Sequence, residues 1–256
     1  MDRLGLEPRL AEALRQVATA LERAGLPYAV IGATALLLNR IDLARTTRDL
    51  DLAVTTRGGL DRVRDVLESA DLRATRVSHR FVTPSDIEVD VLALAGEERE
   101  GATIDLPGGE RITAVGLAAA VRHAVQVKVR GEWEVRVAPL PVLAAIKLHV
   151  ATVRSGDRDL ADALAVMRQY EARGLRRHEV DYALLDSLTW ETAGAWLLGV
   201  DLAPIAEKAT RIAVERAVGL LLQDPRTGGE LAEEPERRTL LAAYLAGLGG
   251  SAPETS

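Results

Sequence analysis

The sequence predicts an α+β protein in which a small mixed sheet with flanking helices is followed by a helical C-terminal part. Short apolar runs typical of strands alternate with helical patterns up to about residue 138. From Pro141 onward, apolar residues recur at helical spacing and strand signals cease. The change of pattern divides the chain into an α/β domain over residues 1–138, a helical domain over 139–248 and a disordered tail over 249–256.

The first part opens with an amphipathic helix, because apolar residues from Leu10 to Leu21 recur at helical spacing and Gly25 with Pro27 ends the pattern. The elements expected after it are a strand at 28–31, a short helix from 32 to about 38, a strand at 50–54, a helix at 58–70, strands at 81–82 and 87–94 around a turn at 84–86, a hairpin within 101–115 with its turn at 107–109, and a hairpin of strands at 126–130 and 133–137.

The second part reads as helices throughout. Pro141 stands where proline is tolerated, at a helix start. Helical periodicity then covers residues 142–153, 160–167, 180–188, 193–198, 205–222 and 231–245. The final residues carry Pro253 among small and polar side chains, which predicts the disordered tail.

Composition limits the class of protein. Hydrophobic residues make up 48% of the 256 residues but aromatic residues only 3%, so Leu, Val and Ala must fill the core. The absence of cysteine excludes disulfides and thiolate metal sites and fits a reducing compartment. No uninterrupted apolar run reaches the roughly 18 residues of a membrane span, and the N-terminus lacks a signal-peptide pattern. We therefore expect a cytoplasmic protein with no membrane association.

The formal net charge of −6 makes the whole surface unsuited to general nucleic-acid binding. A local basic patch remains compatible with this charge. The densest cluster is Arg173, Arg176, Arg177 and His178. Such a cluster is more often a solvated helix end than an RNA-binding site.

Two aspartates dominate the segment before residue 55. Side chains alternate along a strand, so Asp49 and Asp51 should project from one face, ~7 Å apart, while Leu50, Leu52 and Val54 project from the other. Two carboxylates on a largely apolar strand are costly without a cation and bind a hard divalent metal well. The alternative is a pair of ordinary exposed carboxylates.

A third acid is expected on the strand at 87–94. Asp90 is the first choice, but Glu88 shares its face and is the open alternative. Asp86 reads as a turn residue.

Gly32 follows the first strand and opens a helix. Main-chain N–H groups and the positive end of a helix dipole suit a phosphate there. Ala33 can let the backbone approach a phosphate but has no hydroxyl, and Thr34 can either donate a hydrogen bond to it or cap the helix.

Together, the glycine turn, the aspartate pair and the later strand acid resemble nucleotidyltransferases of the DNA polymerase beta type. The pattern Arg45-x-Thr47-x-Asp49-x-Asp51 resembles the AbiEii-like family in particular. Downstream, Lys147, Arg154, Asp159 and Asp162 complete that resemblance, which covers about residues 25–170. Several members of the family are toxins of bacterial toxin–antitoxin pairs. The family usually has Gly or Ser where this chain has Ala33.

The resemblance implies roles for individual residues. Asp49, Asp51 and Asp90 would be catalytic and hold two Mg²⁺ ions, with Mn²⁺ as a substitute. The residues implied in nucleotide binding are Gly32, Ala33, Thr34, Arg48, Lys147 and Asp159, with Asp162 as a further member. Several of them have ordinary alternatives: Lys147 could extend to solvent, Arg48 could be a surface residue, and Asp159 could simply belong to a helix start.

The expected activity is metal-dependent transfer of a nucleotide from an NTP to a hydroxyl, with release of pyrophosphate. The acceptor would be an RNA end such as that of tRNA, a protein or a small molecule, and a cognate antitoxin would be a partner. One alternative is a small-molecule nucleotidyltransferase of the aminoglycoside-modifying type. The other is an inactive module that binds a nucleotide or a partner, which only Ala33 supports.

Overall fold

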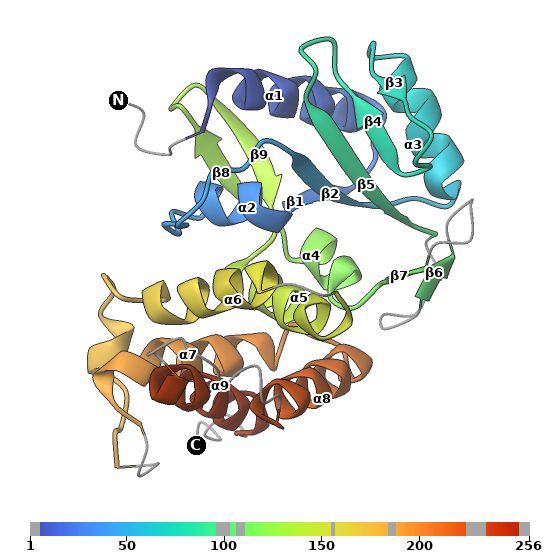
Figure 1. The fold of residues 1–256 in the computed structure, drawn as a ribbon. Helices are drawn as coiled ribbons and strands as arrows, with labels where there is room; N and C mark the ends of the chain where they lie inside the picture. The colour runs from blue at the N-terminus through green and yellow to red at the C-terminus, as the bar shows by residue number, and fades with distance from the viewer. Residues whose placement is uncertain are drawn as a thin grey trace. The chain divides into compact units, whose positions relative to one another are not determined.

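The computed structural model describes residues 6–95, 103–105, 111–154, 157–183, 188–223 and 234–250. The chain divides into two compact units, Met1–Pro139 and Leu140–Ser256. All the strands in the described part of the chain belong to the first unit, and the second unit is built from helices (Figure 1). The predicted α+β class is confirmed.

Apart from β3, which was not predicted, the strands of the first unit follow the predicted order. Their bounds are β1 Tyr28–Ile31, β2 Leu50–Thr55, β3 Arg73–Ala74, β4 Arg80–Val82, β5 Glu88–Leu94, β6 Thr103–Asp105, β7 Arg111–Thr113, β8 Val125–Val129 and β9 Trp133–Val137. Seven of them form one mixed sheet in the order β3-β4-β5-β2-β1-β9-β8, and β6 pairs with β7 separately. The predicted turn at 107–109 lies outside the described residues.

The centre of the sheet is its most apolar part. Strand β1 runs antiparallel to β2 and parallel to β9, while β2 runs parallel to β5. Every residue of β1 is buried, as are Leu50, Leu52 and Val54 of β2. Strands covered on both faces read as continuous apolar runs, which is why the segment from Tyr28 to Ile31 contains no polar alternation.

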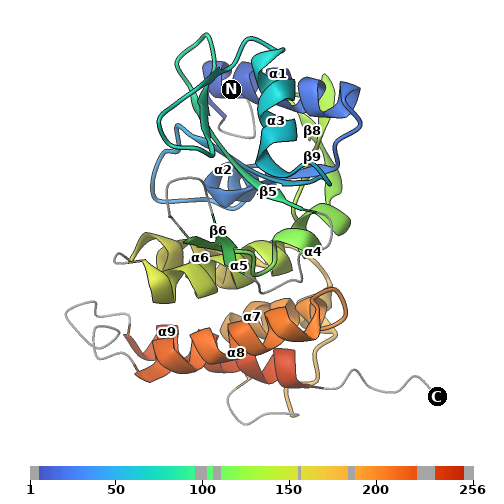
Figure 2. The ribbon, with the colours of Figure 1, turned by 90° about the vertical axis from the view of Figure 1, so that its right-hand side faces the viewer.

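The helices of the first unit are α1 Pro8–Arg23, α2 Gly32–Leu38, α3 Gly59–Glu68 and α4 Leu117–Arg122. Helices α1 and α3 lie on one face of the sheet and α4 on the other (Figures 1 and 2). The apolar stripe of α1 from Leu10 to Leu21 is buried, as its spacing predicts. Helix α4 has no counterpart among the predicted elements; it begins after Gly116, whose φ is +76°.

The second unit contains α5 Leu140–Val153, α6 Arg158–Gln169, the 3₁₀ turn η1 Arg176–His178, α7 Trp190–Leu202, α8 Lys208–Gln223 and α9 Glu234–Gly249. Helices α7 and α9 approach each other closely through two glycines. A Cβ on Gly199 would lie 2.2 Å from the carbonyl oxygen of Tyr244, and one on Gly247 would lie 2.1 Å from that of Trp196. Any larger residue at either position would push the helices apart.

The helix predicted at 180–188 is wrong over residues 180–183, which form no helix. The carboxylate of Asp181 accepts a hydrogen bond from the backbone N–H of Ala183 (3.0 Å), and such a local bond competes with helical pairing. Val180 instead packs with Leu188 and Leu197 in a small apolar cluster. Residues 184–187 lie outside the described part, as do residues 251–256 of the predicted tail. Across the described ranges, no helix combines the length and the apolar character that crossing a bilayer would require.

Candidate functional site

A row of residues crosses four strands of the sheet. Arg80 of β4 pairs with Asp90 of β5, Asp90 pairs with Asp51 of β2, and Asp51 pairs with Ile31 of β1. Residues paired across neighbouring strands project from the same face. The side chains of Arg80, Asp90 and Asp51 therefore stand next to one another, although the sequence places them far apart.

Asp49 immediately precedes β2 and is exposed, whereas Asp51 is half-buried. Two threonine hydroxyls hold the chain around Asp49. Thr47 Oγ1 donates to the Asp49 carboxylate oxygen Oδ1 at 2.7 Å, and Thr34 Oγ1 donates to the Asp49 backbone carbonyl at 2.9 Å. The approach to β2 is thus held at two points, one on the side chain and one on the main chain.

Position 32 requires glycine because the side chain of Asp51 lies against it. Its φ is +67°, in the left-handed region that disfavours other residues, and a Cβ at this position would lie only 2.0 Å from Asp51 Oδ2. The glycine at the end of β1 therefore leaves room for one of the two aspartates.

We expect Gly32→Ala to destabilise the protein by about 1–2 kcal/mol through backbone strain and to displace the Asp51 carboxylate. The matched control is Gly25→Ala, because Gly25 has a φ of +66° and no heavy atom within 4 Å of the added Cβ. Urea unfolding should show a loss of stability in both variants, while the nucleotide transfer expected from the sequence should fail only in Gly32→Ala. Equal activity in the two variants would contradict the role of the Asp51 contact.

Arg80 joins the acids of β5. Its Nε and Nη2 donate to both carboxylate oxygens of Asp90, at 2.7 and 2.8 Å, and its Nη1 lies 3.0 Å from Glu88 Oε2. The hydrogen bonds with Asp90 raise the pKa of Arg80, and the charges of Glu88 and Asp49 add to the rise. Arg80 was not among the predicted site residues, and Thr47 was noted only as part of the motif before Asp51, without the hydrogen bond that it forms.

Asp90 and Glu88 differ in position as candidates for the third acid. Asp90 is the direct cross-strand neighbour of Asp51, and its side chain is 19% exposed, while that of Glu88 is 54% exposed. The arrangement favours Asp90. Asp86 lies in the turn before β5 with a φ of +63°, as a turn residue should.

The arrangement of the acids bears on whether they could hold a metal ion. Within the ranges that the structure describes, no group of three His, Cys, Asp or Glu side chains is placed to hold a metal ion. Asp49 and Asp51 nevertheless offer hard carboxylate oxygens, and Mg²⁺ is usually held by one or two carboxylates together with waters and substrate phosphates. The aspartate pair fits Mg²⁺ in this way, whereas both oxygens of Asp90 are engaged by Arg80.

The predicted phosphate loop is only partly available to a ligand. Thr34 is fully buried, and its hydroxyl is already used by the carbonyl of Asp49, so its side chain supports the aspartate segment. Ala33 is also buried, and Arg48 is exposed. In this structure the Thr34 hydroxyl donates to the Asp49 carbonyl oxygen, and its contact with a nucleotide stays a prediction.

Lys147 lies in the second unit and does not extend to solvent. Only 9% of the residue is exposed, and Nζ lies 2.6 Å from Asp159 Oδ1 and 2.9 Å from Asp162 Oδ2. Burial alone would lower the pKa of Lys147, but the charges and hydrogen bonds of Asp159 and Asp162 outweigh it, so the pKa is raised. The helix pair α5 and α6 thus contains a buried cluster of one lysine and two aspartates.

In the basic cluster at 173–178, Arg173 and His178 are exposed, whereas Arg176 and Arg177 are engaged within the helical unit. Arg177 is 3% exposed and donates to the carbonyl oxygens of Arg168, Tyr170 and Trp190. Arg176 forms a two-bond ion pair with Asp201, at 2.6 and 2.7 Å. These arginines hold the helical unit together, which removes the main reason to expect an RNA site here.

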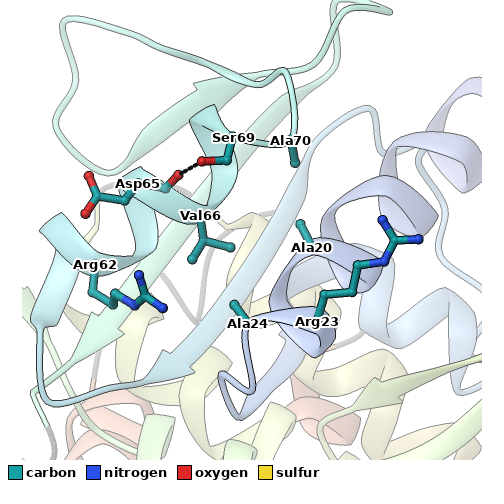
Figure 3. Close-up of a pocket in the computed structure, with 8 residues that line it drawn as sticks. All are labelled: Ala20, Arg23, Ala24, Arg62, Asp65, Val66, Ser69 and Ala70. Carbon is teal, nitrogen blue, oxygen red and sulfur yellow. Dashed lines mark hydrogen bonds between the residues drawn. The ribbon is translucent and has the colours of Figure 1, made fainter.

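A cavity of about 350 Å³ opens between α1 and α3 (Figure 3). Its lining residues are Ala20, Arg23, Ala24, Arg62, Asp65, Val66, Ser69 and Ala70. None of the predicted site residues lines it.

Comparison with known proteins gives one sequence match and several structural ones. A family model described as "Nucleotidyl transferase AbiEii toxin, Type IV TA system" matches residues 12–244. No curated protein sequence matches the chain.

The similar solved structures are distant in sequence. An antigenic nucleotidyltransferase-like protein from Paracoccidioides brasiliensis shares 14% identity, covering 91% of each chain, with a TM-score of 0.45. The antibiotic-resistance factor ANT(2'')-Ia shares 12% identity over 62% of this chain and 83% of its own, with a TM-score of 0.38. The CdnE cyclic dinucleotide synthase of Elizabethkingia meningoseptica shares 11% identity over 94% and 90%, with a TM-score of 0.31.

Proposed function

The chain belongs to the AbiEii family of nucleotidyltransferase toxins of type IV toxin–antitoxin systems, and we propose that it moves a nucleotide from an NTP to a hydroxyl acceptor with release of pyrophosphate. The observation that carries this proposal is the pairing of Asp51 with Asp90, two residues after Asp49. Carboxylates gathered at one place on a sheet are the groups that such a transfer needs.

Asp49 and Asp51 would hold Mg²⁺, with Asp90 on the neighbouring strand as a third ligand. When bound, the metal supplies positive charge at the phosphate that is attacked and lowers the pKa of a hydroxyl beside it. Asp90 would orient the acceptor hydroxyl and accept its proton, because it is the half-buried acid next to Asp51. Thr47 and Thr34 keep Asp49 in position through their hydrogen bonds.

The nucleotide would be bound by main-chain N–H groups at Gly32 and Ala33 and by the exposed guanidinium of Arg48. Lys147 and Asp159 enter this proposal only through the family resemblance, because Lys147 is already paired with two aspartates. We expect the acceptor to be an RNA end, a protein or a small molecule, and an antitoxin to be the natural partner of a toxin of this family.

The proposal is tested by incubating the full chain with each α-³²P-labelled NTP, Mg²⁺ and bacterial RNA and protein. Label should move to one class of acceptor, and the class that becomes labelled identifies the substrate. The reaction should stop when EDTA removes the metal. Transfer that continues in EDTA would contradict metal dependence, and no transfer with any NTP or acceptor fraction would contradict the proposed activity.

A further inference from the structure

Arg80 occupies the position of a counter-ion in the row of acids. Its guanidinium uses three nitrogens to contact two carboxylates of β5, and Asp90 is held through both of its oxygens. On the other side of Asp90 stands Asp51, its neighbour on β2. The acid that should serve the reaction is therefore bound on one side by a cation and faced on the other by a like charge.

Electrostatics explains why an arginine is needed here. Asp90 and Asp51 are adjacent on one face, and neighbouring strands lie ~4.8 Å apart, so two ionised carboxylates would repel each other. The side chain of Asp90 is mostly shielded from water, so solvent screens this repulsion only in part. The planar fork of a guanidinium matches a carboxylate with two parallel hydrogen bonds, which a lysine cannot reproduce.

We propose that Arg80 is a positioning residue that competes with the metal for Asp90. Arg80 holds both carboxylate oxygens of Asp90. For Asp90 to join Asp49 and Asp51 in holding a metal ion, Arg80 would have to release at least one of these two oxygens. This inference rests on the proposed function. The contact is regulatory within that site. Arg80 holds the Asp90 carboxylate in place and, in the absence of nucleotide, lowers the affinity of the site for metal.

The contact with Glu88 makes such an exchange feasible. Glu88 lies two residues before Asp90 on the same face of β5, so Arg80 keeps one carboxylate partner when it leaves the other. An arriving triphosphate brings further oxygens, and guanidinium groups bind phosphate as well as carboxylate. The arginine therefore always has an acceptor for its donors, and the exchange does not leave a buried charge unpaired.

The test is a titration of the full chain with Mn²⁺ in the absence of nucleotide. Electron paramagnetic resonance measures the free ion and so gives the affinity. Arg80→Gln should tighten binding by about tenfold, which corresponds to about 1.4 kcal/mol. In an Asp90→Asn background the same substitution should have no effect, because Arg80 acts through Asp90. The control is Arg64→Gln, since Arg64 forms an ion pair with the exposed Asp61 within α3, and it should leave the affinity unchanged.

The outcomes separate this inference from the proposed function. If Asp49→Asn with Asp51→Asn binds Mn²⁺ as well as the unsubstituted protein, the metal site itself is wrong. Two other results would overturn only the competition, provided that the double aspartate variant loses Mn²⁺. One is that Arg80→Gln binds Mn²⁺ no tighter than the unsubstituted protein. The other is that Arg80→Gln tightens Mn²⁺ binding as much in the Asp90→Asn background as in the unsubstituted protein. Should Arg80→Gln not fold, Arg80→Lys keeps the charge without the two-bond fork, and a gain of a few-fold is expected.

Discussion

Replacing Asp49 and Asp51 together by asparagine should lower nucleotide transfer by about 1,000-fold or more, because the variant would lose the ligands of the proposed metal, which would stabilise the developing charge. Asparagine keeps the shape of aspartate, so Thr47 can still donate to the side-chain oxygen at position 49. At position 51 the substitution removes a negative charge beside Asp90. The fold should therefore remain intact.

Two measurements check this expectation. Label transfer from NTP gives the loss of activity, and urea unfolding should give a free energy of unfolding within about 1 kcal/mol of the original value. Asp61→Asn is the matched control, because Asp61 is an exposed carboxylate of the same unit on α3. Undiminished turnover in the double variant would remove the aspartate pair from the reaction.

Replacing Lys147 by methionine should destabilise the protein by about 3–5 kcal/mol, since it leaves two carboxylates in a buried place without their cation. The side chain of Asp162 is only 4% exposed, and that of Asp159 18%, so water cannot compensate either charge fully. The expected loss is among the largest for any single substitution in this chain.

The designed control is the triple variant Lys147→Met, Asp159→Asn and Asp162→Asn, in which no charge remains. It should recover most of the stability in urea unfolding, because replacing a whole buried ion cluster by neutral groups of similar volume is often nearly neutral. A different outcome would indicate a role in nucleotide binding: Lys147→Met would keep its stability and raise the KM for NTP.

Much of the central sheet could be predicted from local sequence. The run from Tyr28 to Ile31 is wholly apolar and is followed by Gly32. Strand β1 ends and helix α2 begins at this glycine, as predicted. The hairpins around β4 and β5 and around β8 and β9 were also predicted, because each has a strong turn signal. Short elements without such signals were missed: α4 is a six-residue helix, and its alanines favour no particular face.

Arg80 was missed because the strand was predicted to begin at Phe81. The turn at 84–86 already determines the register, since it pairs Val82 with Glu88 and Phe81 with Val89. One further step along the same hairpin places Arg80 opposite Asp90. The position of Arg80 could therefore have been predicted from the register of the hairpin, although nothing about an arginine at this position indicates it.

Other contacts could not be predicted from one sequence. The pairing of Lys147 with Asp159 and Asp162 depends on how α5 and α6 cross, and helical spacing within one segment carries no information about that crossing. The burial of Arg177 similarly depends on three carbonyl oxygens that come from outside its own turn.

The parallel pairing of β1 with β9 has a consequence for synthesis of the chain. Val30 of β1 lies beside Leu52 on one side and Val137 on the other. During synthesis, one edge of the apolar strand β1 therefore stays unpaired until β9 has left the ribosome. By then every candidate acid of the first unit has long been made. An uncovered strand edge of this kind pairs readily with other chains. Interrupted translation should therefore yield aggregating fragments and not partially active enzyme.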